Sequence, residues 1–248
     1  MKILLAGESW MTGESHTKGF DHVTLGRYEE PGLDLIRTLE KLDMEVTWYP
    51  NHMAQKYFPE TAEELSQFDV VVLSDITSNT LLLDPDMMFR CQIHGNRLEA
   101  IREYVRLGGG FVMIGGYMSF AGINCCARYN MTPLRDVIPV KIMNYDDRMD
   151  TPEGVSPHIV KPDHPILKGV TEPWPRYLGY NYVEEKEGTE VLVKIRDSVG
   201  LACAPFGEGR AVATAFDALP HWALPEVLEW ECYNQLWKNI MEWAAGVI

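Results

Sequence analysis

The side chains with the most potential for chemistry directly follow four apolar segments of the sequence. Short apolar segments bounded by glycine or polar residues are typical of buried strands. The residues that follow them are Glu8, Ser9 and Trp10 after MKILLAG, Asp75 and Asn79 after VVVLS, Gly116, Tyr117 and Ser119 after FVMIG, and Asp217, His221 and Trp222 after GRAVATAF. A set that combines carboxyls, hydroxyls, an imidazole and indoles could bind a small polar molecule and move a proton.

His221 is the candidate acid or base of this set, because imidazole titrates near neutral pH. Tyr117 or Ser119 could bind or attack a substrate. Three carboxylates could orient the imidazole: Glu8, Asp75 and Asp217. The pattern therefore predicts proton transfer supported by a carboxylate.

The same residues suit a ligand rich in hydroxyl groups. Carboxylates accept hydroxyl protons, and the indole faces of Trp10 and Trp222 can stack on sugar rings. Structural roles are the alternative: Asp75 and Glu8 could cap a helix or turn, and His221 could simply pack beside Trp222. In that case the protein would be a binding or assembly module without chemistry.

The elements that must position these residues alternate between strands and helices in the first half of the chain. Strands are expected at MKILLAG, MEVTWYP, Val70–Leu73 and FVMIGG. Helices are expected over Leu33–Leu42 and over NRLEAIREYVRLGGG, where Leu98, Ile101 and Val105 share one face and glycine ends the helix. This order predicts right-handed crossovers and a parallel sheet.

The second half of the chain contains more strands and fewer helices. We expect strands at DVIPVKIM, EVLVKI, GLACAPF and GRAVATAFD, which would extend the sheet in an antiparallel or mixed manner. The last segment, LPEVLEWECYNQLWKNIMEWAAG, is predicted to be one helix with an apolar stripe of Tyr233, Leu236, Trp237, Ile240, Met241 and Ala244. Without repeats or linkers, residues 1–248 are expected to form a single domain.

Ligands of open parallel sheets bind where the carboxyl ends of the strands meet. The four polar loops should therefore converge on one edge, including the first loop with His16, Lys18 and Asp21. At the break after FVMI, Gly115 and Gly116 would let the backbone pack tightly under a pocket and present Tyr117.

The bulk composition excludes several partner classes. The net charge of −14 would repel nucleic acid and anionic membranes, and no apolar run is long enough to span a bilayer. The N-terminal apolar run is too short for a signal peptide, and the five scattered cysteines fit reduced thiols. We expect a cytoplasmic protein without nucleic-acid or membrane partners.

The sequence resembles the class I glutamine amidotransferase superfamily on its ThuA-like side. The motifs that carry the resemblance are GESW, KGFD, LSDITSNTLLL, GGGFVMIGGYMSF, DDRMDTPEG, DHPILKGV, WPRYLGYN and PHWA, which span nearly the whole chain and are most similar to a bacterial group described as "putative glutamine amidotransferase". The resemblance implies a flavodoxin-like, three-layer α/β/α fold with a mostly parallel sheet. It also implies a strand–elbow–helix unit around Gly115–Ser119.

The residues that glutaminase chemistry requires are missing from the motifs that match the family. An active glutaminase resembles G-x-C-x-G at the elbow, where this chain has Tyr117 in place of the cysteine and Ser119 in place of the second glycine. The histidine and glutamate expected after Phe216 are replaced by Asp217-Ala218-Leu219, and the oxyanion glycines by Ser74-Asp75. Glutaminase activity is therefore not expected.

The prediction is a glutamine amidotransferase-like protein that binds or acts on a small, carbohydrate-like ligand, with no cofactor and no resident metal. A metal-dependent hydrolase built on His221 and Asp217, with Asp75 or Glu8, is a further alternative. The segment YDDRMD is expected to be an exposed loop with an Asp–Arg pair rather than a cation site. The seven tryptophans and 12 methionines favour a homo-oligomer.

Overall fold

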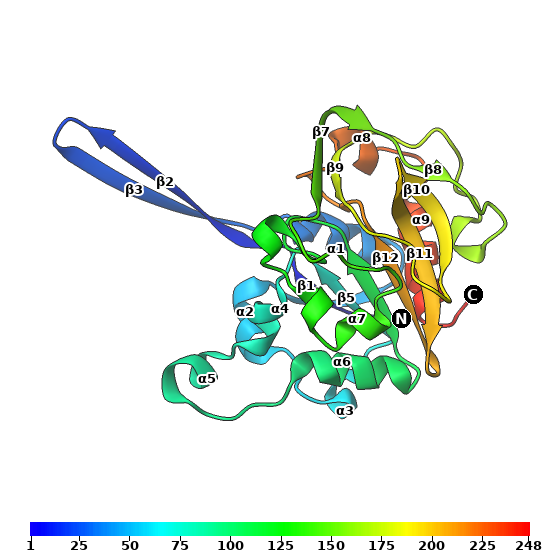
Figure 1. The fold of residues 1–248 in the computed structure, drawn as a ribbon, viewed down its shortest axis with the longest axis horizontal. Helices are drawn as coiled ribbons and strands as arrows, with labels where there is room; N and C mark the ends of the chain where they lie inside the picture. Colours follow the sequence, from blue (N-terminus) through cyan, green and yellow to red (C-terminus); the bar gives the residue numbers. More distant parts are fainter.

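A computed structural model describes all 248 residues and has one large sheet at its centre (Figure 1). The strand order is β4-β1-β5-β6-β12-β11-β10-β8. Its parallel part comprises β1 (Lys2–Gly7), β4 (Glu45–Tyr49), β5 (Val70–Ser74), β6 (Gly110–Ile114) and β12 (Gly209–Thr214). The antiparallel extension comprises β11 (Ser198–Phe206), β10 (Glu190–Ile195) and β8 (His158–Ile159). The predicted α/β fold with a flavodoxin-like sheet is confirmed.

Both faces of β1, β5, β6 and β12 are buried, which explains their apolar sequences, whereas β4 lies at the edge of the sheet and has no fully buried residue. In β1, Ile3 and Leu5 point into one core cluster, while Leu4 and Ala6 point into the other. The first cluster lies under α1 (Gly32–Lys41) and α9 (Tyr233–Ala244), and the second lies under α2 (Asn51–Tyr57), α3 (Ala62–Leu65) and α6 (Arg97–Arg106). The chain therefore has the three predicted layers.

The helix α6 follows the sequence prediction closely. Leu98, Ile101 and Val105 are fully buried, and the side chain of Asn96 caps the helix by accepting from the N–H groups of Leu98 and Glu99 at 3.1 and 3.2 Å. Two short helices precede α6: α4 (Ser78–Leu82), whose Leu81 joins the second core cluster, and α5 (Pro85–Arg90), which buries no residue. None of the helices is both long and apolar enough to cross a bilayer.

Two predicted elements of the second half are wrong. The segment DVIPVKIM contains the end of the short helix α7 (Leu134–Val137) and no strand, because Pro139 forces Ile138 out of the helix while Ile138 and Val140 stay buried in the core. The last segment forms two helices, α8 (Pro225–Leu228) and α9, rather than one. The predicted apolar stripe of α9 is buried as expected.

The first polar loop was expected at the sheet edge, but most of it forms a long β-hairpin that extends away from the body (Figure 1). We call residues 10–29 the arm: β2 (Trp10–Lys18) pairs antiparallel with β3 (Asp21–Glu29). Only Glu8, Ser9 and the first residue of the arm stay near the edge. His16, Lys18 and Asp21 lie toward the tip of the arm, so their expected place at the edge is corrected.

The expected strand–elbow–helix unit is also corrected, because no α-helix directly follows β6 and the next one, α7, begins only at Leu134. Residues after Ile114 form turns and two short 3-10 helices, Ile123–Cys125 and Tyr129–Met131, and a third covers Pro165–Leu167. Tyr117 has no left-handed backbone of the kind that a strained nucleophile elbow uses. A separate two-stranded sheet of β7 (Arg148–Val155) and β9 (Tyr177–Asn181) lies against this region.

Candidate functional site

A cavity of about 610 Å³ opens at the carboxyl edge of the parallel strands. The loops after all five parallel strands contribute to it, as the topology of open α/β sheets requires. Its walls are formed by Ser9, Trp10, Asn51, Asp75, Thr77, Thr80, Tyr117, Met118, Ile123 and His221. The sequence-predicted residues Ser9, Trp10, Asp75, Tyr117 and His221 therefore lie together.

His221 is held between aromatic rings at the wall of this cavity. Its ring stacks on Trp10 with 4.2 Å between centroids, and it meets the ring of Tyr117 edge-on at 5.5 Å. Its Nδ1 lies 4.0 Å from Oδ2 of Asp217, which is an ion-pair distance and too long for a direct hydrogen bond. Burial lowers the pKa of His221, and the nearby Asp75 opposes that shift, so the imidazole is neutral at neutral pH.

Three buried carboxyl groups lie beneath the imidazole. Burial raises the pKa of Glu8 to about 8, the charge of Asp75 adds to the increase, and a hydrogen bond from the Ser74 hydroxyl opposes it. Burial together with the charges of Glu8 and Asp75 raises the pKa of Asp217 well above its usual range. Glu8 and Asp217 are therefore mostly protonated at neutral pH, although Asp217 is the carboxyl nearest to the imidazole.

Asp75 is the member of this cluster best suited to carry charge. Burial raises its pKa, while a hydrogen bond from the Met118 N–H at 2.7 Å and the nearby His221 act in the opposite direction. The backbones of Glu8 and Asp75 are both left-handed, with φ of 52° and 44°. Such strained positions are common at functional sites.

The two glycines before Tyr117 are required by close packing. A Cβ on Gly115 would lie 2.5 Å from the carbonyl oxygen of Ala215, and one on Gly116 would lie 2.9 Å from Oδ1 of Asp75. Gly116 itself does not line the cavity, although the next residue, Tyr117, does. The predicted reason for this glycine pair, tight backbone packing beneath a pocket, agrees with these distances.

Tyr117 projects from this turn and is packed on both sides. The ring of Trp222 lies 5.0 Å from it, and the guanidinium of Arg148 lies 5.2 Å from the ring centroid. Trp222 itself is buried, donates from Nε1 to Asp150 at 3.2 Å and does not line the cavity. Trp222 therefore packs against the ring of Tyr117 and supports it.

Four other predicted residues do not line the cavity: the buried carboxyl groups of Glu8 and Asp217, together with Ser119 and Asn79. Ser119 is fully buried, and its hydroxyl donates to the carbonyl of Ile114 at 2.5 Å while accepting from the Asp75 N–H at 3.3 Å. It holds the turn together and is not presented to a ligand. Asn79 lies in α4 but does not line the cavity, whereas Thr80 of the same helix does.

Asn51 is a cavity residue that the sequence analysis missed. Its side-chain amide donates to the carbonyl of Ser9 at 2.6 Å and to that of Asp75 at 3.3 Å, and its N–H donates to the Ser9 hydroxyl at 2.8 Å. Asn51 thus ties three loops together. It directly follows the second parallel strand and Pro50, so the rule that selected the other loops would have found it.

The segment YDDRMD contains a second residue that was missed. The expected pair is present between Asp146 and Arg148, with 2.9 Å between Oδ2 and Nη2. The neighbouring Asp147, however, is fully buried and accepts from the N–H groups of Ala121 and Gly122, both at 2.9 Å. Asp147 holds the turn that presents Tyr117.

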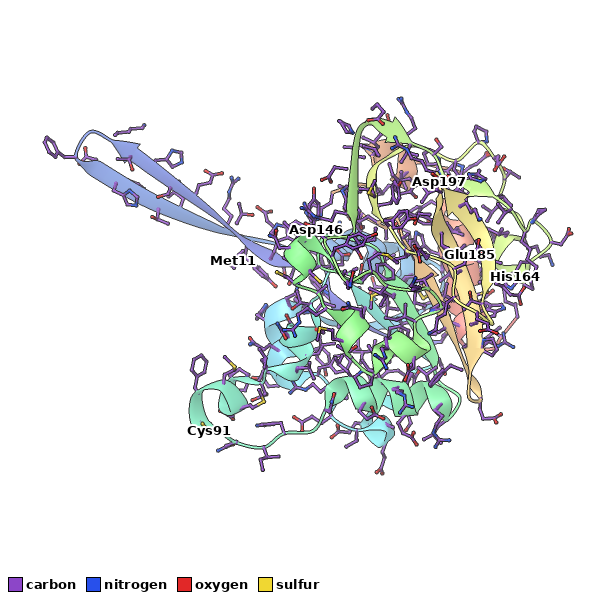
Figure 2. All side chains as sticks on the ribbon, viewed as in Figure 1. Met11, Cys91, Asp146, His164, Glu185 and Asp197 are labelled. Carbon is purple, nitrogen blue, oxygen red and sulfur yellow. The ribbon has the colours of Figure 1, made fainter.

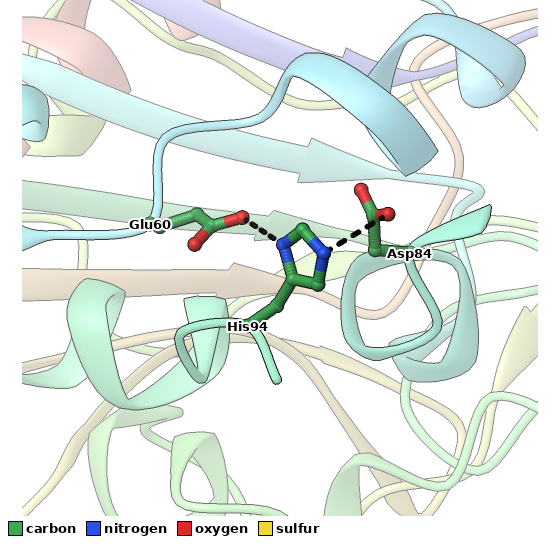
Figure 3. Close-up of side chains that lie close together, drawn as sticks. All are labelled: Glu60, Asp84 and His94. Atoms are coloured by element: carbon green, nitrogen blue, oxygen red, sulfur yellow. Dashed lines mark hydrogen bonds and ion pairs between the residues drawn. The ribbon is translucent and has the colours of Figure 1, made fainter. Parts of the chain in front are cut away.

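One group of side chains outside the cavity has spacing compatible with a cation: Glu60, Asp84 and His94 (Figure 3). Nδ1 of His94 lies 3.0 Å from Glu60, and its Nε2 lies 3.5 Å from Asp84. Buried Arg97 lies 3.3 and 3.2 Å from the same two carboxylates. Since the guanidinium already neutralises these carboxylates, the group fits a structural ion-pair network better than a metal centre.

Comparisons with known proteins agree with the fold over the entire chain. The family model described as "Putative glutamine amidotransferase" matches residues 2–246. The cytoplasmic protein STM3548 from Salmonella typhimurium is similar at 38% identity and a TM-score of 0.95, covering 98% of this chain and 99% of its own. The cytoplasmic protein STM1381 from Salmonella typhimurium LT2 is 39% identical, with the same TM-score and coverage.

A more distant structure is that of a protein from Parabacteroides merdae described as "putative thua-like". It is 13% identical with a TM-score of 0.56, covering 98% of this chain and 89% of its own, and so it shows likeness of fold alone. A search among curated proteins found no match.

Proposed function

The chain belongs to the glutamine amidotransferase-like family, and from this premise we propose that it acts on a small hydroxyl-bearing molecule by proton transfer. The observation that carries the proposal is the position of His221, which stacks on Trp10, meets Tyr117 and opens onto a cavity of about 610 Å³. A cytoplasmic location is part of the proposal, supported by two Salmonella relatives described as cytoplasmic proteins.

In the proposed reaction, neutral His221 accepts a proton from a ligand hydroxyl. The imidazolium that forms is stabilised by the Asp75 carboxylate, whose interaction with His221 already influences both groups. Tyr117, supported by Trp222 and Arg148, would orient the ligand through its phenol group.

The cavity wall favours a polar ligand of modest size. Hydroxyls of Thr77 and Thr80 lie 3.0 Å apart at the wall, and the indole of Trp10 contributes an aromatic ring to the same wall. This combination resembles the general character of small-molecule sites, in which a few polar groups orient a ligand against aromatic rings. A sugar or polyol is the ligand class that we propose.

Ligand binding can be tested by thermal unfolding in the presence of individual monosaccharides and polyols at millimolar concentration. A compound present at 100 times its dissociation constant adds about 2.7 kcal/mol of stability, so the melting temperature should rise by about 5 °C or more. We expect at least one such compound to act in this way and His221→Asn to lose most of the shift.

The matched control is His158→Asn, which changes an exposed histidine on β8 and should retain the full shift. A panel in which no hydroxyl-rich compound stabilises the protein would contradict the proposed ligand class. A shift that His221→Asn leaves intact would instead contradict the proposed role of the imidazole.

Glutamine hydrolysis is not expected, because no cysteine lines the cavity. Without a thiolate nucleophile, a glutamine-analogue alkylator should label no cavity residue, and glutamine should release no ammonia above background. Mass spectrometry of the treated protein checks this result. Stoichiometric labelling of Cys125 or Cys126 that glutamine prevents would show that a thiol site exists after all.

A further inference from the structure

The wall of the cavity at the sheet edge contains one carboxyl group with a free oxygen. Oδ1 of Asp75 accepts from the Met118 N–H at 2.7 Å, whereas Oδ2 accepts no hydrogen bond from the protein. Asp75 is only 6% exposed, yet it is one of the residues that line the cavity. A buried oxygen of this kind is costly to leave without a donor, so the contents of the cavity must supply one.

Asn51 presents a second free acceptor beside Asp75. Both hydrogens of its side-chain amide are used, because Nδ2 donates to the carbonyls of Ser9 at 2.6 Å and of Asp75 at 3.3 Å. These two carbonyls fix the orientation of the amide, so the atom without a partner is Oδ1, which can only accept. Since Asn51 also lines the cavity, both free acceptors belong to the same part of its wall.

No lysine or arginine lines the cavity, so no positive side chain in the wall balances a charge on Asp75. Arg148 packs on the ring of Tyr117 without lining the cavity, and it is already paired with Asp146 at 2.9 Å. His221 is neutral at neutral pH because burial lowers its pKa. An anionic ligand would therefore meet a carboxylate and no opposite charge.

A ligand that suits this wall brings hydrogen-bond donors and a positive charge. A protonated amine has three donors and no acceptor, and its hydrogen bond to a carboxylate is charge-assisted. The net charge of −14 attracts cations to the molecule and repels anions. Hydroxyl groups of the same ligand can bind the remaining polar groups of the wall, which are the hydroxyls of Ser9, Thr77, Thr80 and Tyr117 and the indole N–H of Trp10.

We infer that the ligand of this cavity is an amino sugar or an amino alcohol whose protonated amine binds Oδ2 of Asp75. Asp75 then distinguishes amines from neutral polyols, and sugars that carry phosphate or carboxylate groups are excluded. The inference rests on the proposed function for the site and for the hydroxyl-bearing ligand, but not on the proton transfer itself. A bound ammonium favours ionised Asp75 and neutral His221, which are the forms from which the proposed reaction starts.

Matched pairs of compounds test the charge of the ligand separately from its hydroxyl groups. Serinol and D-glucosamine each carry a protonated amine at a position where glycerol and D-glucose carry a hydroxyl group. Isothermal titration calorimetry at neutral pH should show that each amine binds on the order of tenfold more tightly than its neutral counterpart, because charge-assisted hydrogen bonds are the stronger ones. N-acetyl-D-glucosamine, whose amide is uncharged, should bind no more tightly than D-glucose.

Asp75→Asn tests the assignment to this residue, because it keeps the shape of the side chain and removes its charge. Asparagine tolerates the left-handed backbone at this position, where φ is 44°, so the fold should be retained. In this variant serinol and glycerol should bind with equal affinity. Asp197→Asn, which changes an exposed carboxylate, is the control and should retain the full preference for amines (Figure 2). Circular dichroism of each variant shows whether the fold is retained.

The possible failures can be told apart. Glycerol and D-glucose binding as tightly as the corresponding amines would overturn the inference and leave the proposed function intact. If none of these compounds binds, the ligand class of the proposed function is contradicted together with the inference. A preference for amines that Asp75→Asn retains would overturn the assignment of the amine to Asp75.

Discussion

Replacing Asp147 by alanine should destabilise the protein by more than about 3 kcal/mol, because it leaves several buried donors without an acceptor. The carboxylate accepts from the N–H groups of Ala121 and Gly122 at 2.9 Å and from Nδ2 of Asn181 at 3.0 Å. Each unsatisfied buried donor costs about 1–3 kcal/mol. The loss should appear in urea unfolding as a lower midpoint with an unchanged slope.

The effect should extend to the turn that presents Tyr117. Asn181, which Asp147 holds, accepts from the Gly116 N–H at 2.9 Å and donates to the Gly116 carbonyl at 3.1 Å. Loss of Asp147 therefore loosens both ends of the segment between Gly116 and Gly122. Faster amide exchange in that segment than in the rest of the protein would report this loosening.

Asp197→Ala is the control, because Asp197 is exposed and the change removes a carboxylate of the same type (Figure 2). It should alter stability by less than about 0.5 kcal/mol. Asp147→Asn should lie between the two, since the amide keeps one oxygen acceptor but turns an NH₂ group toward a buried donor. A loss below about 1 kcal/mol for Asp147→Ala would contradict the role assigned to this carboxylate.

Replacing Glu8 by glutamine should make the protein more stable at alkaline pH and leave it almost unchanged at pH 5. Burial raises the pKa of Glu8 from 4.5 to about 8, so the folded state binds this proton more tightly than the unfolded chain does. The stabilisation is complete below the unfolded pKa and is lost as pH rises toward the folded one. Between pH 5 and pH 8 the wild type should lose about 3 kcal/mol through Glu8, and Glu8→Gln should not.

Other groups titrate in the same region, so the difference between variant and wild type is the quantity to measure. Raised pKa values of Asp75, Asp147 and Asp217 act in the same direction as Glu8, whereas the lowered pKa of His221 destabilises the folded state as the pH falls. Urea unfolding at several pH values from 5 to 8 gives this difference.

Exposed Glu187→Gln is the control and should follow the wild type at every pH. Equal stabilities of Glu8→Gln and wild type at pH 8 would mean that Glu8 is ionised in the folded protein at neutral pH. The buried carboxyl cluster would then carry more charge than the structure indicates.

The sequence by itself determined the layered fold and most of the edge where the cavity lies. The strands β1, β5, β6 and β12 are buried on both faces, so their apolar runs are visible without a structure. The stripe on α9 is equally visible, because helical periodicity is a local property. Parallel topology then brings Ser9, Asp75, Tyr117 and His221 to one edge.

Tertiary structure decided the features whose causes lie far apart in the chain. Asn181 and Gly116 are 65 positions apart in the sequence, and Glu8 and Ser74 are 66 positions apart, so neither contact can be recognised from a local pattern. The arm was missed because neither of its faces is buried, so no selection for core packing gave it a strict apolar alternation. The segment DVIPVKIM was wrongly predicted to be a strand for a different reason. Burial selects apolar side chains, but an apolar segment can be buried as a helix, a turn or a strand. Local sequence patterns indicate which faces of an element are buried. The pKa values of buried carboxyl groups, and the turns held by side-chain hydrogen bonds, depend instead on which residues the folded chain places beside them.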